Sequence, residues 1–379
     1  MDYESLKFAA LETAQVVPVT GCKNHDAVAR HLHALGTTHA YRVLGGMLSS
    51  KLIKSARFDR QLDDYVHNEM WAHLADDVDA DDDGSHISTI AKNNVWAKID
   101  FFVLLTVYCG GDASMENYKM EVWVVINSAE QAAPSMIAAF NKYILALWEL
   151  WDGKTLYFKG IEDYHLDSLP GIECSTCIQC LNYSMDHKDW GHIFHPGQFA
   201  KSVAVQDLGL QLDNLQSEDI GIIQGLNVIT YDKRYLGHCC PASSCICRSG
   251  DSQPVAWGVC HADFQISALM TTTTYRSHGL AKFIIHDIGT KMLQEFTAKI
   301  VPLYSNCSSD YPFKLQMVTE LTNYNTHQLF ECFGFKPVSN VSWAECKFDC
   351  KAYIANTVPL ILSYNMFGQD TFLAPYINI

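Results

Sequence analysis

The chain has 379 residues, of which 48% are hydrophobic and 18% charged, a composition that excludes a disordered protein. This length predicts two domains, each large enough to bury its own core. The formal net charge of −15 argues against a nucleic-acid-binding protein, because phosphate neutralisation needs clustered Lys and Arg and the sequence contains no such cluster.

The first domain is expected to span residues 24–168, after an N-terminal extension of residues 1–23 that lacks a signal core and an Arg-rich transit pattern. Its apolar runs are of strand length, too short to cross a membrane. An acidic insert at residues 76–84 interrupts it. The pattern predicts an α/β domain with strands at 39–44, 101–108 and 120–125 and a helix at 134–151.

The second domain is expected to span residues 169–350, since Leu169-Pro170-Gly171 has the turn chemistry of a junction. Two strand-rich runs, 242–248 and 254–260, flank turn residues and predict a hairpin. A strand at 264–270, a helix from Leu280 to about residue 296, a strand at 313–318 and a helix ended by Gly334 follow. The apolar tail, 351–379, is expected to pack on the protein.

The turn between the strand 264–270 and the helix at Leu280 carries the clearest chemical signal. It reads Tyr275-Arg276-Ser277-His278-Gly279-Leu280-Ala281, and Gly279 removes a Cβ that would block close approach to the main chain. Main-chain N–H groups and the positive end of a helix meet there. Such a turn favours an anion, and a diphosphate in particular.

The order of these elements resembles the GNAT superfamily of acyl-CoA-dependent N-acyltransferases. The turn at 276–281 matches its pyrophosphate loop, and the segment 329–335 matches its closing helix, which ends in Gly-Phe. Within the superfamily the chain most resembles the glycine N-acyltransferase family, through 275–280, through Pro254-Val255-Ala256-Trp257 and through 338–343. Weaker similarity at 39–45 and 96–103 implies a second, more divergent GNAT-like α/β domain in the first half.

This resemblance implies acyl-CoA as co-substrate, held by main-chain groups of the strand end and of the turn. The cofactor-binding residues that it implies are Leu269, Met270, Thr271, Arg276, Ser277, His278, Gly279, Leu280, Ala281 and Asn325. Arg276 could instead form a surface ion pair. Asn325 could instead cap the helix that follows it.

The catalytic base departs from the family pattern. The family has an acidic residue on the strand before the turn, and that position is Gln265 here, whose amide cannot act as a base. Asp263, or His261 through a water, could replace it, and Asp263 could equally be a turn residue. The tyrosine that the superfamily often uses as a general acid falls at Phe330.

Fourteen cysteines raise the possibility of a metal site. Cys174, Cys177 and Cys180 have a spacing that would suit zinc or iron–sulfur, but it also places three thiols along one face of a helix, where cysteine is commonly a small buried hydrophobe. We expect Cys245 and Cys247 to point to opposite sides of their strand. No metal is therefore expected.

The sequence predicts an acyl-CoA-dependent N-acyltransferase that transfers an acyl group to glycine or a similar small amino acid by direct attack, as in conjugation reactions. The alternatives are an acyl-CoA-binding pseudoenzyme, because of Gln265 and Phe330, and a metal-stabilised interaction protein, because of the cysteines. We expect a location in the cytoplasm or the mitochondrial matrix, with no nucleic-acid partner and no membrane span. The sequence leaves the oligomeric state open, and a monomer is compatible with it.

Overall fold

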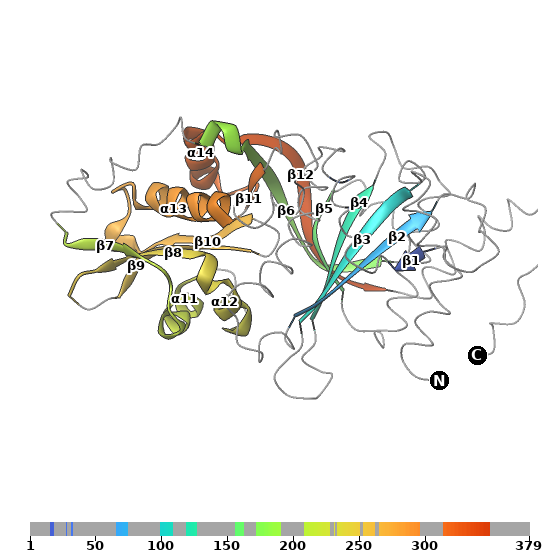
Figure 1. Cartoon of the computed structure of the whole chain (residues 1–379), viewed down its shortest axis with the longest axis horizontal. Coiled ribbons are helices and arrows are strands. Elements are labelled where there is room, and N and C mark those ends of the chain that lie inside the picture. Colours follow the sequence, from blue (N-terminus) through green and yellow to red (C-terminus); the bar gives the residue numbers. More distant parts are fainter. Residues whose placement is uncertain are drawn as a thin grey trace, which may run out of the picture.

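The computed structural model describes residues 16–18, 28, 32, 66–74, 99–108, 119–126, 156–162, 172–190, 208–227, 231, 233–250, 253–261, 265–295 and 314–348. Their strands form one 12-stranded mixed sheet in the order β1-β2-β3-β4-β5-β12-β6-β11-β10-β9-β8-β7 (Figure 1). The strands are β1 Val16–Pro18, β2 Val66–Leu74, β3 Ile99–Tyr108, β4 Lys119–Ile126, β5 Leu156–Glu162, β6 Ile172–Asp186, β7 Leu210–Asp213, β8 Ser243–Arg248, β9 Pro254–Cys260, β10 Gln265–Thr271, β11 Lys314–Glu320 and β12 Lys336–Phe348.

The two halves of this sheet repeat one pattern. In the first half, β2, β3 and β4 pair antiparallel, and β4 then pairs with β5 in parallel. In the second half, β8, β9 and β10 pair antiparallel, and β10 then pairs with β11 in parallel. Short strands, β1 and β7, add to the two outer edges. The prediction of an α/β protein with two related mixed-sheet halves is therefore confirmed.

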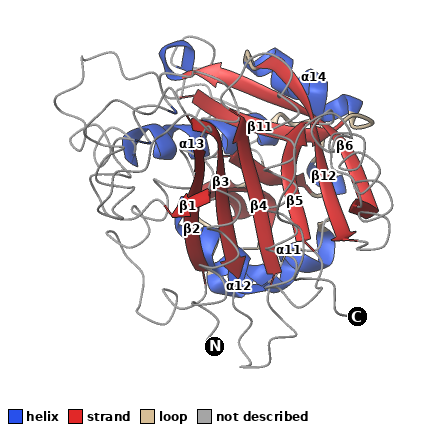
Figure 2. Ribbon diagram, turned by 90° about the vertical axis from the view of Figure 1, so that its right-hand side faces the viewer, coloured by secondary structure: helices blue, strands red, loops and turns tan. Residues whose placement is uncertain are grey.

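The last long strands of the two halves lie at the centre of the sheet, each beside the other half. β6, which follows β5 in the chain, pairs antiparallel with β11 of the second half. β12, which follows β11, pairs antiparallel with β5 of the first half. β6 and β12 also pair with each other from Lys336–Ser184 to Phe348–Ile172. Figure 2 shows β12 running between β5 and β6. Reciprocal placement of these strands makes the sheet continuous.

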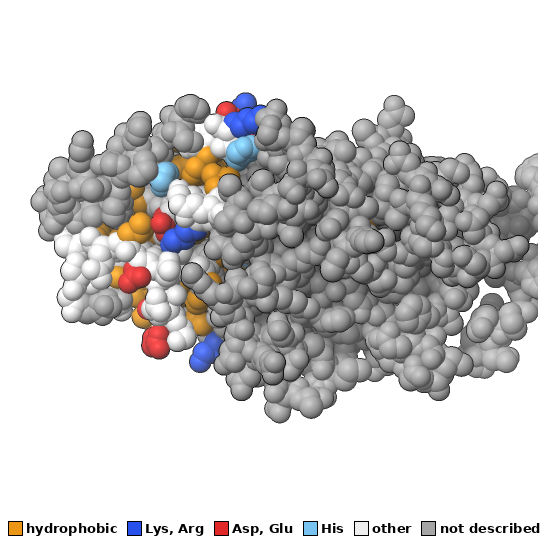
Figure 3. All heavy atoms as spheres, in the orientation of Figure 1, with side chains coloured by type: hydrophobic (Ala, Val, Ile, Leu, Met, Phe, Trp, Pro, Cys, Tyr) orange, Lys and Arg blue, Asp and Glu red, His pale blue; other side chains and the backbone are white. Residues whose placement is uncertain are grey.

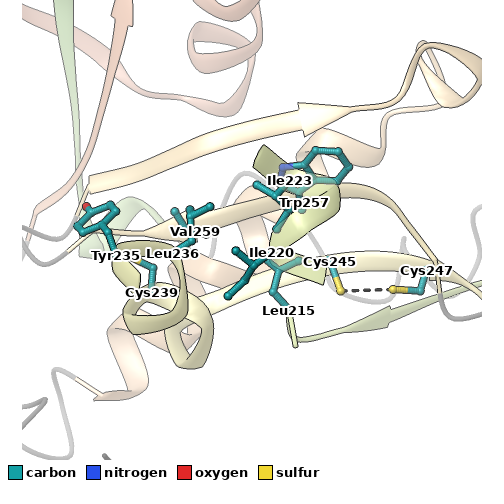
Figure 4. Packing of buried hydrophobic residues seen from close by; sticks show 10 residues of the cluster. All are labelled: Leu215, Ile220, Ile223, Tyr235, Leu236, Cys239, Cys245, Cys247, Trp257 and Val259. Atoms are coloured by element: carbon teal, nitrogen blue, oxygen red, sulfur yellow. Dashed lines mark hydrogen bonds between the residues drawn. The ribbon is translucent and has the colours of Figure 1, made fainter. Parts of the chain in front are cut away.

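Helices cover both faces of the second half. α13, Leu280–Glu295, packs along β8, β9 and β10. On the opposite face lie α11, Ile220–Leu226, and α12, Lys233–Cys239 (Figure 1). A buried cluster joins α11 and α12 to the sheet (Figure 4). Its members are Leu215, Ile220, Ile223, Tyr235, Leu236, Cys239, Cys245, Cys247, Trp257 and Val259.

Several predicted elements are present with bounds shifted by one or two residues. The strands at 101–108 and 120–125 are β3 and β4, and the hairpin is β8 with β9. The strands at 264–270 and 313–318 are β10 and β11. α14, Tyr324–Phe333, ends at Gly334, which adopts the left-handed φ of 99° that a helix stop favours. The segments 39–44, 76–84, 134–151, 169–171 and 351–379 lie outside the described residues.

The expected helix around Cys174, Cys177 and Cys180 is wrong. These residues belong to β6, a strand of 15 residues that is paired on both sides, by β11 and by β12. A spacing of three residues suits a helix locally, but pairing with two neighbouring strands satisfies the main-chain groups of the whole segment. The long-range partners therefore decided the local structure.

Candidate functional site

The turn between β10 and α13 has an unusual main-chain conformation. A short 3₁₀ helix, Thr273–Tyr275, leads into it. Ser277 and Gly279 then both adopt left-handed conformations, with φ of 66° and 73°. A Cβ built on Gly279 would meet no heavy atom within 4 Å, so the space above the turn is open. Because these two left-handed residues have only one residue between them, the main chain bends sharply into the first turn of the helix.

Several main-chain N–H groups of this turn form no hydrogen bond with the described residues. In the part of the chain that is described, no acceptor bonds the N–H groups of Ser277, His278 or Gly279, and the first bond onto the helix runs from the Lys282 N–H to the Gly279 carbonyl at 3.0 Å. α13 has no acidic residue in its first turn. These donors and the positive helix end make the site predicted for a diphosphate.

Two basic side chains brace the turn through carbonyl groups. Arg276 Nε donates to the Thr271 carbonyl at 3.2 Å, which ties the end of β10 to the turn. His278 Nδ1 lies 2.8 Å from the Arg276 carbonyl and 3.3 Å from that of Tyr275, so Nδ1 carries the proton. Arg276 therefore bonds to the main chain of the turn. A surface ion pair had been the alternative expectation for this residue.

β10 and β11 part near the N-terminal end of β10. Their parallel register contains only two pairs, Gln265–Gln316 and Ile266–Met317. On its other side β10 remains paired with β9, across a bulge in which Ala268 has a φ of 49°. No register pair joins residues 267–271 to β11. The main-chain groups of Leu269, Met270 and Thr271 on that side are therefore outside the ladder, where the sequence predicts the pantetheine arm.

The expected base residues lie at the opposite, N-terminal end of β10. Gln265 is buried, with 3% of its surface exposed. Its carbonyl accepts the His261 N–H at 2.8 Å, which brings the two residues together across the β9–β10 connection. Asp263 lies outside the described residues.

Two tyrosines that the sequence did not single out complete this region. The Tyr235 hydroxyl and His261 Nδ1 are hydrogen-bonded, and their rings lie 5.3 Å apart. Tyr231 stacks on Tyr235 at 6.2 Å, and its hydroxyl is 3.3 Å from Ser267 Oγ. Tyr235 lies in α12 and Tyr231 precedes that helix, so no helical spacing in the sequence identified the pair. His261 and Ser267 are thus each hydrogen-bonded to one of two stacked tyrosines.

The helix α14 places the remaining predicted residues. Its N-cap is Asn323, whose Oδ1 accepts the Thr326 N–H at 3.3 Å, so the alternative role of Asn325 as the cap is wrong. Asn325 is exposed in the first turn. Phe330 is 2% exposed and packs edge-on against Tyr183, with 5.4 Å between ring centroids. Phe330 is a core residue.

The expectation for Cys245 and Cys247 is also wrong. Residues two apart share a face of a strand, and the two sulfurs lie 3.4 Å apart within the buried cluster (Figure 4). The hydrogen bond with Cys247 first, and then burial, raises the pKa of the Cys245 thiol. Within the described ranges, no three His, Cys, Asp or Glu side chains are grouped so that they could hold a metal ion.

One face of the second half is visible in the space-filling view. Apolar, histidine and charged side chains of the described residues are interspersed there, and Lys or Arg appears beside Asp or Glu (Figure 3).

None of the helices in the described ranges is long and apolar enough to cross a membrane.

No protein-family model and no curated protein matches this chain. Among solved structures, an X-ray structure of a Drosophila protein superposes with a TM-score of 0.59 at 11% identity, covering 87% of this chain and 98% of that chain. The likeness shows the fold.

Two further structures are similar with lower scores, which carry no argument by themselves. A tandem GNAT protein from the clavulanic acid biosynthesis pathway has a TM-score of 0.43 at 9% identity, covering 87% of this chain and 98% of that one. A GCN5-related N-acetyltransferase from Sphaerobacter thermophilus has 0.45 at 8% identity, covering 88% and 96%. The closer resemblance to the glycine N-acyltransferase family stays a prediction.

Proposed function

We propose that this protein is an acyl-CoA-dependent N-acyltransferase whose acceptor is glycine or another small amino acid. The observation that carries the proposal is the turn at 277–279, where three N–H groups have no acceptor among the described residues and a Cβ on Gly279 would meet no atom within 4 Å. The ladder of β10 and β11 ends after Ile266, so the residues of β10 that lead to the turn have no register partner on β11. A diphosphate at the turn and an extended pantetheine arm along β10 would use both sets of main-chain groups.

The acceptor amine is proposed to bind beside His261, Gln265 and Ser267, on the face that α12 covers. Tyr235 and Tyr231 form one wall of this region. Gln265 is an amide and serves to bind rather than to accept a proton. In the tautomer that acts as a base, His261 Nδ1–H donates to the Tyr235 oxygen and Nε2 takes the amine proton.

The reaction would proceed by direct attack of the amine nitrogen on the thioester carbonyl carbon. The C–N bond forms first, as the π electrons of the carbonyl move to its oxygen and the base takes the amine proton. The carbonyl then re-forms, and the C–S bond breaks with its electron pair leaving on the CoA thiolate. Main-chain N–H groups of β10 would stabilise the oxyanion between these steps. Asp263 is the second candidate for the base, and the pH–rate profiles of Asp263→Asn and His261→Gln would separate the two.

A second candidate function, an acyl-CoA-binding protein without transferase activity, is favoured by two buried residues. Gln265 and Phe330 occupy the positions of the family's base and of its frequent acid, and both are at most 3% exposed. CoA binding alone needs only the turn and β10.

Product analysis tests both functions. The full chain is incubated with acetyl-, butyryl- and benzoyl-CoA and a panel of amino acids, and N-acylated products are measured by mass spectrometry beside calorimetry of CoA binding. Binding with turnover supports the transferase. Binding without turnover for every pair selects the binding protein, and absence of binding contradicts both.

A further inference from the structure

Two cysteines that are far apart in the sequence face each other at the centre of the sheet. Cys174 on β6 and Cys346 on β12 are direct cross-strand partners, and their sulfurs lie 2.9 Å apart across 172 residues of chain. A register shift between Glu345 and Cys346 brings them opposite, and Ser175 Oγ donates to the Glu345 carbonyl at 3.1 Å beside it. The irregularity of the ladder thus aligns two thiols.

The two thiols differ in access to solvent. Cys174 is exposed, whereas Cys346 is 2% exposed. Cys177, also exposed, lies on the same strand opposite Ala344 and is a competing thiol. An oxidant in solution can therefore reach Cys174. Cys346 is already in position to react with the oxidised Cys174.

We propose that Cys174 and Cys346 form a disulfide that links β6 to β12. β6 belongs to the first half and lies beside strands of the second half, and β12 belongs to the second half and lies beside strands of the first. The bond would join the two halves covalently at their shared centre, and this inference does not depend on the proposed acyl transfer.

The chemistry requires a two-electron oxidant, for which hydrogen peroxide serves. The thiolate of Cys174 attacks one peroxide oxygen, the O–O bond breaks, and Cys174 becomes a sulfenic acid as one water is released. The Cys346 sulfur then attacks the Cys174 sulfur, and the S–O bond breaks. Cys346 loses its proton, a second water leaves, and the disulfide remains.

The order of these steps follows from the environment of Cys346. Burial first, and then its hydrogen bond with Cys174, raises the pKa of the Cys346 thiol. Cys346 therefore stays protonated at neutral pH and is a poor initial nucleophile towards peroxide.

Peptide mapping of the full chain under non-reducing conditions tests the proposal. After treatment with hydrogen peroxide, we expect a linked peptide pair in which fragmentation assigns the bond to Cys174 and Cys346. Dithiothreitol should abolish it. The midpoint of thermal unfolding should shift upwards on oxidation and return on reduction, because the bond constrains the unfolded chain.

Matched variants separate this bond from other thiol chemistry. Cys174→Ser should remove the linked peptide and the thermal shift. Cys177→Ser and Cys332→Ser, which alter two other exposed cysteines, should retain both. Because Cys174 is exposed, its variant tests the bond even if Cys346→Ser fails to fold. A bond between Cys174 and Cys177, or peroxide oxidation of Cys174 without a link to Cys346, would overturn the proposal.

Discussion

Ser277 and Gly279 adopt the same left-handed conformation on either side of His278, with φ of 66° and 73°. Their N–H groups, with that of His278, have no acceptor among the described residues. The function of the turn as an anion site depends on keeping both conformations.

Gly279→Val should therefore weaken CoA binding about tenfold or more, because a β-branched residue is strained at positive φ and would shift the N–H groups. Isothermal titration calorimetry with CoA measures this. Gly209→Val is the matched control, since Gly209 has a φ of 60° and equally open surroundings in a different turn. Equal losses of affinity in both variants would show a general folding effect.

Tyr235→Phe should lower kcat about tenfold or more while the affinity for CoA stays unchanged. The change removes the hydroxyl bonded to His261 Nδ1 and leaves the ring that packs in the cluster. The pH–rate profile should shift as well, because the imidazole loses a partner. An unchanged profile, with normal rates, would exclude His261 as the base that Tyr235 orients.

Asn323→Ala should destabilise the protein by about 1 kcal/mol, because the N-cap bond to the Thr326 N–H is lost. Asn325→Ala should leave the free energy of unfolding nearly unchanged, since Asn325 is exposed. Urea denaturation of the two variants measures the difference. If Asn325 contacts the cofactor as the family resemblance implies, only its replacement should reduce CoA affinity. A loss of stability in Asn325→Ala, with none in Asn323→Ala, would refute Asn323 as the N-cap.

Gly289→Ala should destabilise the protein by about 1–3 kcal/mol, because the new methyl group would overlap the indole of Trp190, which is 6% exposed. Gly221→Ala in α11 should instead stabilise it by about 0.5–1 kcal/mol, since no atom lies within 4 Å and alanine favours a helix. Thermal unfolding of both variants checks the contrast. Equal stabilisation would mean that Trp190 does not pack on α13.

His286 should make stability depend on pH. It stacks on Trp190 at 5.7 Å, and burial lowers its pKa, although Asp287 opposes part of the shift. The unfolded imidazole, with a pKa near 6.5, therefore binds a proton before the folded one does. The free energy of unfolding should fall as the pH drops below about 6.5, and His286→Gln should reduce that fall. Urea titrations at pH 7.5 and 5.5 measure it, and equal falls would place the pH dependence elsewhere.

The order of elements from β8 to α14 could be predicted from the sequence because its signals are local. Turn residues separate β8 from β9, and Gly334 ends α14 with a positive φ. Gly279 marks the turn that the structure shows to be left-handed. Such preferences act over a few residues, so residues adjacent in the sequence determine them.

The region around His261 could be predicted only in part. His261 and Gln265 stand four apart in the sequence, and their main-chain bond is local. Tyr235 reaches His261 from a helix 26 residues earlier. Its position depends on how α12 packs on the sheet, which the sequence around Tyr235 does not specify.

Sequence alone determined the α/β class, the hairpin, the turn before α13 and the helix stop at Gly334, because each depends on short-range backbone preference. Tertiary structure decided that β6 is a strand, that β6 and β12 lie between the halves, and that Cys174 meets Cys346 across 172 residues. Strand pairing satisfies main-chain groups from any distance along the chain. Its partners are therefore selected by packing of the whole sheet, and no local pattern records them.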